Sequence, residues 1–213
     1  MAHPFSLRRV LGIVALAAGL AASTAQAGVV LLVDGSGVLT GATGVSVGSN
    51  LYDVQFTDGS CDGLFNSCTT TAFAFHSSSA ATAASQALLD QVLLDGAQGH
   101  FDTVPGLTQG CVSSASPCVV ITPYGLTSIV INGLPTLAAT TEFAENYSAS
   151  GDTVAGGFAY EHYFDTAQAA NGGGFTWAVW SPSAPSTVPE PQTLALVGVG
   201  FAALWGSRRR AGR

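Results

Sequence analysis

Lysine is absent from this 213-residue chain, and all six of its lysine-or-arginine positions are arginines near the two ends. They are Arg8, Arg9, Arg208, Arg209, Arg210 and Arg213, so residues 28–187 contain neither residue type. That central part has no side chain for a lysine or arginine salt bridge. It also lacks the arginine fork that recognises phosphate and carboxylate ligands, and the cations that displace counterions from nucleic acid. We therefore expect no nucleic-acid partner.

Carboxylates, in contrast, are spread along the whole central part. Residues 28–187 hold twelve acids: Asp34, Asp53, Asp58, Asp62, Asp90, Asp95, Asp102, Glu142, Glu145, Asp152, Glu161 and Asp165. They dominate the formal net charge of −7. Such groups must be solvated, hydrogen-bonded, paired with protonated histidine or bound to cations. Divalent cations and neutral sugars are the partners that this composition favours.

The amino-terminal end has the order of parts found in a secretory signal. Arg8 and Arg9 supply the positive charge, an apolar stretch covers Val10–Ala22, and Ala25-Gln26-Ala27 forms an A-x-A cleavage site. Cleavage by signal peptidase after Ala27 would leave Gly28 as the new amino terminus. Residues 1–27 are therefore predicted to be a helical signal peptide. An uncleaved anchor and twin-arginine export are the alternatives.

The carboxyl-terminal end carries a second apolar stretch, followed by a basic stop. The 14 residues Thr193–Gly206 contain no charge. As a helix they would reach about 21 Å, which is short of the roughly 20 residues that usually cross a bilayer. Trp205 stands at the polar edge, and Arg208, Arg209 and Arg210 are expected to stay cytoplasmic. A buried core helix is the alternative, although core helices are rarely apolar all round.

Three elements at this end occur in a specific order: Val188-Pro189-Glu190-Pro191, the apolar stretch and the arginine cluster. Together, over residues 188–213, they resemble the PEP-CTERM sorting signal of Gram-negative bacteria. The resemblance implies that an exosortase, an integral-membrane cysteine protease, recognises Pro189, Glu190 and Pro191 and removes the tail. It also implies export through an inner-membrane intermediate to the cell surface, outer membrane or matrix, and association with exopolysaccharide or biofilm.

Between the two signals, the sequence predicts one α+β domain over residues 28–180 and a Ser/Pro/Ala linker over 181–187. One clear helix is expected at about 80–94, capped by Ser78 or Ser79 and ended by Gly96. Strands are expected at 28–33, 51–56, 119–122, 128–132, 157–164 and 174–180, forming a mainly antiparallel sheet. Residues 34–50 are expected to be turns or short strands. The last two strands are expected to pair with each other.

The four cysteines form two pairs with equal spacing, Cys61/Cys68 and Cys111/Cys118. Export leads to an oxidising compartment, so disulfides are expected. Three connectivities are possible, and the two local loops are favoured because each closes over a turn-rich stretch. A zinc site would require closer cysteine spacing or nearby histidines. We therefore expect no metal or other cofactor.

Two short motifs have both a chemical and a plain structural interpretation. Gly44–Gly48 matches the G-x-S-x-G pattern around Ser46, but a nucleophile elbow requires a helix after it, and an alternating strand follows here. Asp58–Gly63 begins like a calcium loop. Thr69 stands where the bidentate glutamate belongs, so an acidic turn closed by the first disulfide is favoured.

The histidines and aromatic residues are the remaining candidates. His76, His100 and His162 have no metal-type spacing, and none is assigned a catalytic role. A sugar platform is conceivable, although aromatic residues at strand spacing are more often core. Its members would be Tyr160, Glu161, Tyr163, Trp177 and Trp180.

The sequence as a whole predicts an exported, non-catalytic surface or matrix protein. A secreted hydrolase acting on matrix polysaccharide and a calcium-dependent adhesin are the alternatives.

Overall fold

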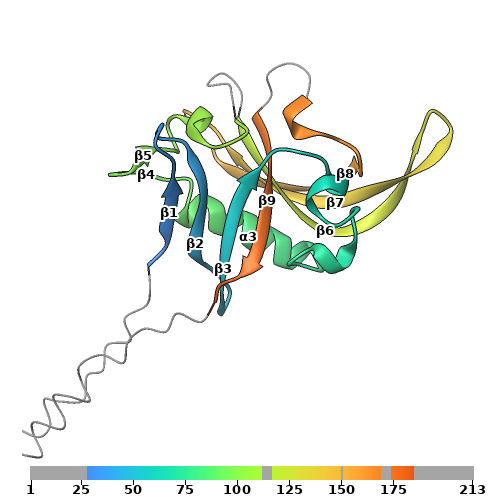
Figure 1. The fold of residues 1–213 in the computed structure, drawn as a ribbon, viewed down its shortest axis with the longest axis horizontal. Coiled ribbons are helices and arrows are strands. Elements are labelled where there is room, and N and C mark those ends of the chain that lie inside the picture. The colour runs from blue at the N-terminus through green and yellow to red at the C-terminus, as the bar shows by residue number, and fades with distance from the viewer. Residues whose placement is uncertain (1–27, 112–116, 150, 169–173, 185–213) are drawn as a thin grey trace, which may run out of the picture.

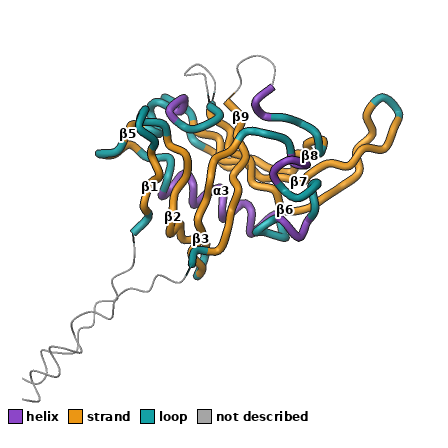
Figure 2. Tube along the Cα trace, in the orientation of Figure 1, coloured by secondary structure: helices purple, strands orange, loops and turns teal. Residues whose placement is uncertain are grey.

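The computed structural model describes residues 28–111, 117–149, 151–168 and 174–184. Within them the protein is mostly β-sheet (Figures 1 and 2). The strands are β1 (Val30–Val33), β2 (Leu39–Val47), β3 (Asn50–Thr57), β4 (Asp95–Gly96), β5 (Gly99–His100), β6 (Cys118–Ile131), β7 (Leu134–Asn146), β8 (Thr153–Glu161) and β9 (Gly174–Pro182). The helices are α2 (Cys61–Leu64) and α3 (Ser78–Gln91), with short 3-10 helices η1 (Thr70–Ala72), η2 (Pro105–Leu107) and η3 (Thr166–Gln168).

Seven of these strands form one sheet in the order β1-β2-β3-β9-β6-β7-β8. Its neighbouring strands are antiparallel except β6 and β9, which run parallel. The predicted pairing of residues 157–164 with 174–180 is therefore wrong. β8 pairs with β7, whereas β9 inserts between β3 and β6 in the middle of the sheet. β9 also includes Ser181 and Pro182, the first two residues of the expected linker.

The predicted helix is present as α3 and covers one face of the sheet (Figure 1). Its N-cap is Ser77, whose side chain accepts a hydrogen bond from the Ala80 N–H, so the helix begins two residues earlier than expected. It also ends earlier, at Gln91, and Gly96 belongs to β4. Its apolar residues Ala81, Ala84 and Leu88, together with Val92 just after it, are spaced as one stripe and are all buried.

Two other expectations about strands are corrected. Residues 119–122 and 128–132 belong largely to one long strand, because β6 continues through Pro123 with a register shift between Pro123 and Gly125. Such a bulge accommodates an extra residue without ending the strand. The stretch 34–50 contains the nine-residue strand β2. The apolar run 28–33 suggests a buried strand, but β1 lies at the edge of the sheet and Val30 is 55% exposed.

The core is divided between the two faces of the sheet. On the helix face, α3 packs against small and aliphatic residues of the strands, including Val54, Val120, Ala144 and Ala178, and against Trp180. On the opposite face an aromatic cluster forms around Trp177, with Phe65, Phe73 and Phe143. Alternation along β9 explains the division, because Trp177 and Trp180 are three residues apart and therefore point to opposite faces.

Candidate functional site

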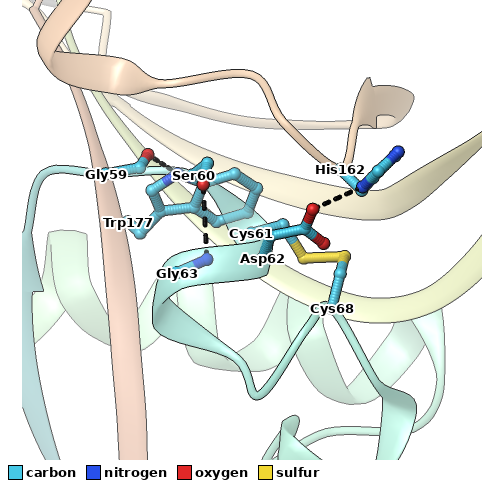
Figure 3. Close-up of a disulfide and its surroundings, with 8 residues drawn as sticks. All are labelled: Gly59, Ser60, Cys61, Asp62, Gly63, Cys68, His162 and Trp177. Atoms are coloured by element: carbon cyan, nitrogen blue, oxygen red, sulfur yellow. Dashed lines mark hydrogen bonds and ion pairs between the residues drawn. A yellow bond between two sulfur atoms is a disulfide. The ribbon is translucent and has the colours of Figure 1, made fainter.

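Among the described residues, a disulfide and several side-chain hydrogen bonds come together in the segment between β3 and α3. This segment covers the face of the sheet that carries the aromatic cluster, which we call the aromatic face. We call this arrangement the disulfide corner; it comprises Gly59, Ser60, Cys61, Asp62, Gly63, Cys68, His162 and Trp177 (Figure 3). Ser60 caps the short helix α2 by accepting a hydrogen bond from the Gly63 N–H at 3.3 Å. Asn66, Ser67 and Cys68 then have left-handed backbone angles, with φ of 48°, 57° and 53°. This tight reversal brings Cys68 back to Cys61.

The structure joins Cys61 to Cys68 and Cys111 to Cys118, the two local pairings favoured by the sequence. All four cysteines are buried. The first disulfide belongs to the aromatic cluster and the second to the core under α3. Each face of the sheet therefore contains one covalent cross-link.

The outer side of the corner is tied to the segment that follows β8. The Asp62 Oδ2 atom lies 2.7 Å from Nδ1 of His162 (Figure 3). The backbone N–H of Asp62 also donates to the carbonyl of His162 at 3.0 Å. The two side chains are 40% and 31% exposed. The contact joins residues 100 positions apart in the chain. His162 is half-buried, and nothing in the spacing of the residues indicated Asp62 as its partner.

Part-buried hydrogen bonds fix the side of the corner that faces the sheet. The indole Nε1 of Trp177 donates to the Gly59 carbonyl at 2.9 Å (Figure 3). Thr166, which begins η3, donates its backbone N–H to the same carbonyl at 3.1 Å and accepts from the Gly59 N–H at its hydroxyl. That hydroxyl also lies 3.1 Å from the Asp58 carboxylate. The corner is thus held by the hydrogen bonds of Gly59, by the contact between Asp62 and His162, and by the Cys61–Cys68 disulfide.

This geometry differs from the calcium-loop interpretation of the Asp58–Gly63 motif. Asp58 is engaged by Thr166, Asp62 turns to His162, and Cys61–Leu64 is helical, so the acidic positions do not converge as they would in a calcium loop. Among the described residues no cluster of three histidine, cysteine or acidic side chains has a metal-holding arrangement. The Asp62–His162 pair has the form of a base and its orienting acid. The neighbouring hydroxyl of Ser60, however, is used as the helix cap.

The aromatic sugar platform is not formed. Trp177 is fully buried, and Trp180 is 7% exposed on the opposite face with its Nε1 donating to Thr122 Oγ1 at 3.3 Å. Tyr160 packs into the aromatic cluster, and burial together with the charge of Glu145 raises the pKa of its phenol. Tyr163 is 52% exposed, and a hydrogen bond to Glu161 raises its pKa. These residues therefore offer no shared face to a ligand.

Ser46 and the other histidines lie apart from the corner. The backbone of Ser46 is held by the side-chain amide of Gln91, at 3.0 Å and 2.8 Å, so it sits in a strand rather than at a nucleophile elbow. His76 is exposed. His100 lies 3.5 Å from Asp95 beside the small β4–β5 hairpin. The Thr103 backbone N–H is the main group that lowers the pKa of Asp95.

Most predicted sorting residues lie outside the described part of the chain. They are Ala25 and Ala27 at the amino-terminal end, and Pro189, Glu190, Pro191, Arg208, Arg209 and Arg210 at the other. Gly28, the expected new amino terminus, is the first described residue and is exposed. In the described part of the chain, neither α-helix has the length and apolar character needed to cross a bilayer.

A sheet protein with two buried disulfides is thus the class that the fold defines. Comparison with protein families gives one more specific result, because the model of the PEP-CTERM protein-sorting motif matches residues 187–210. The chain therefore carries a PEP-CTERM sorting domain, which marks it as an exported protein processed by an exosortase, a membrane protein. Searches of curated proteins and of solved structures find no match.

Proposed function

We propose that this chain is a non-catalytic protein of the cell surface or extracellular matrix, associated with exopolysaccharide or biofilm after its tail is removed. The observation that carries the proposal is the sorting motif at residues 187–210. Two buried disulfides support it, since such bonds persist in oxidising compartments outside the cytoplasm. The corner also supports a structural role, because its polar groups are hydrogen-bonded to one another.

The charge of the central part supports a particular kind of partner. Residues 28–187 carry twelve carboxylates and no lysine or arginine, so a polyanion would be repelled. A neutral polysaccharide, or one bridged by divalent cations, is the partner that fits. Such a protein would be retained in the matrix without strong ionic attraction. Washing cells with concentrated salt should therefore leave most of the protein in the polysaccharide fraction, whereas full release by salt would contradict this retention.

Intact-mass analysis of the protein recovered from cell fractions tests the sorting step. In exosortase-competent cells we expect a product that begins at Gly28, contains two disulfides and lacks Phe201 and the arginine cluster. The Pro189→Ala variant should keep its tail and accumulate in the inner membrane. The matched Pro185→Ala variant should be processed normally, because it changes a proline just outside the motif. Wild-type protein that keeps Phe201 in these cells would overturn the proposal.

Two assays separate the proposal from its alternatives. Incubation with polysaccharide from the same cells should produce no new reducing ends, whereas their appearance would establish a hydrolase. Thermal unfolding at millimolar calcium should give an unchanged melting temperature. A specific calcium ligand would raise it, because ligands that bind the folded state stabilise it.

A further inference from the structure

The β6–β7 hairpin extends well beyond the rest of the sheet (Figures 1 and 2). We call its outer part, residues 126–137, the arm. β9 pairs with β6 only over Cys118–Ile121, and β8 pairs with β7 only from Ala138 onward. The arm is therefore a two-stranded ribbon, and a ribbon of two strands is marginally stable by itself in water.

The arm is apolar, uncharged and exposed. Val130, Leu134 and Leu137 are 73%, 68% and 41% exposed. No charged residue occurs between Asp102 and Glu142, although the rest of the described chain contains all twelve carboxylates of residues 28–187. Exposed edges of sheets are usually protected by charged side chains, especially lysine, or by proline. The arm has no charge to serve this purpose.

The register shows which backbone groups of the arm face outward. Asn132 and Gly133 have φ of 51° and 81°, the angles of a two-residue hairpin turn, and Ile131 pairs with Leu134 beside it. Hydrogen-bonded pairs then alternate with non-hydrogen-bonded pairs along the ribbon. Leu126, Ser128 and Val130 fall at the non-hydrogen-bonded positions. Their N–H and C=O groups therefore point away from β7.

The two edges of the arm differ. On β7, Pro135 stands at an outward-facing position and has no N–H to offer. The next outward carbonyl, that of Leu137, accepts a hydrogen bond from the His162 N–H at 3.1 Å. On β6, no backbone partner outside β7 is present among the described residues for Leu126, Ser128 or Val130. The β6 edge of the arm is therefore the open one.

We infer that this edge pairs with the same edge of a second copy of the chain. In antiparallel pairing, Ser128 of one copy lies opposite Ser128 of the second copy. Leu126 of each copy then lies opposite Val130 of the other. Each of these pairs then exchanges two backbone hydrogen bonds, and the two arms join into a four-stranded ribbon. The spacing of the outward-facing residues is therefore self-complementary about Ser128.

Charge explains why the arm is the favoured contact between copies. The remainder of the two copies carries carboxylates without lysine or arginine, so contacts between those surfaces are repulsive. The uncharged arm lets the copies join away from these surfaces. The inference goes beyond the proposed function and does not depend on the sorting step, because it rests on the arm alone.

Sedimentation velocity of the exported protein recovered from cells, from about 10 µM to about 1 mM, tests the inference. We expect a reversible monomer–dimer equilibrium that strengthens with added salt, since salt screens the repelling carboxylates. Ser128→Pro removes an outward N–H from each copy and should weaken dimerisation about tenfold. Ser128→Ala keeps that N–H and should dimerise like the wild type. A wild-type chain that stays monomeric throughout this range would overturn the inference.

A matched pair of substitutions locates the interface. Val130→Glu places a carboxylate on the open edge and should abolish dimerisation. Val30→Glu makes the same change on β1, the exposed strand at the far edge of the sheet, and should leave dimerisation intact. Loss of dimers in Val30→Glu but not in Val130→Glu would place the contact on β1 and refute the arm interface. Circular dichroism and the melting temperature of each variant report whether its fold is retained.

Discussion

The helix face and the aromatic face of the large sheet are covered in different ways. α3 covers the first with a regular helix whose backbone satisfies its own hydrogen bonds. Residues 58–73 cover the second with irregular chain and two very short helices, which need bonds from elsewhere. Those bonds come from Trp177, Thr166, His162 and the Cys61–Cys68 disulfide. The aromatic face should therefore open locally before the helix face does.

Among the substitutions that test this comparison, removal of a tryptophan should have the largest effect on the free energy of unfolding. Trp177→Ala should reduce the free energy of unfolding by about 3–5 kcal/mol, through loss of a fully buried side chain. Trp180→Ala is the matched control on the other face. In urea titrations both variants should be strongly destabilised. In hydrogen exchange, amides of residues 59–73 should lose protection first in Trp177→Ala, whereas α3 should lose it first in Trp180→Ala. The same exchange pattern in both variants would contradict the prediction that the two faces of the sheet open independently.

The two disulfides provide a second comparison, because each has a sequence separation of 7. The chain-entropy model assigns each loop about 2–3 kcal/mol. We expect the Cys61→Ala/Cys68→Ala and Cys111→Ala/Cys118→Ala variants to have similar losses of global stability in urea titrations. Their local effects should differ, with limited proteolysis cutting residues 59–73 rapidly only in the first. Equal susceptibility of this segment would show that the other bonds of the corner hold it without the disulfide.

The helix face contains a buried acid that gives a third prediction. Glu142 is 6% exposed, accepts a hydrogen bond from Ser78 Oγ at 2.7 Å at the beginning of α3, and lies directly against Gly156. A methyl group at residue 156 would overlap this carboxylate, so Gly156→Ala should cost about 1–3 kcal/mol. In a Glu142→Ala background the penalty should disappear. A double-mutant cycle measured by chemical unfolding gives this coupling, and additive effects would refute it.

The parts of the fold that were predicted correctly depend on short-range patterns. α3 follows from a serine cap and a stripe of Ala81, Ala84 and Leu88, and each disulfide from two nearby cysteines. The β6–β7 hairpin was missed, although Asn132-Gly133 is a strong signal for such a turn. Pro123 and Gly125 divided the long strand in the prediction, whereas the structure absorbs them in a bulge.

The parts that were missed depend on long-range pairing. Phe175 and Trp177 lie in one cluster, as alternation along a strand predicts, but alternation does not identify the neighbouring strand or show which face of the sheet is covered. β9 pairs in parallel with β6, so its partners are more than 50 residues away. The separation of Trp177 from Trp180 is a local effect instead, because residues three apart in one strand point to opposite faces and so enter two separate parts of the core. Asp62 and His162 meet only because β8 and the loop after β3 converge at the corner.

The smallest expected effect concerns the Asp62–His162 contact, which is partly exposed. Asp62→Asn should cost at most about 1 kcal/mol, because solvent screens such pairs. Asp90→Asn on α3 is the matched control, since its carboxylate accepts from the neutral Gln86 amide at 2.9 Å. Thermal unfolding of the two variants and the wild type measures the difference between the two costs. An Asp62→Asn cost no larger than that of Asp90→Asn would show that the backbone hydrogen bond between Asp62 and His162, rather than the side-chain contact, ties the corner to the end of β8.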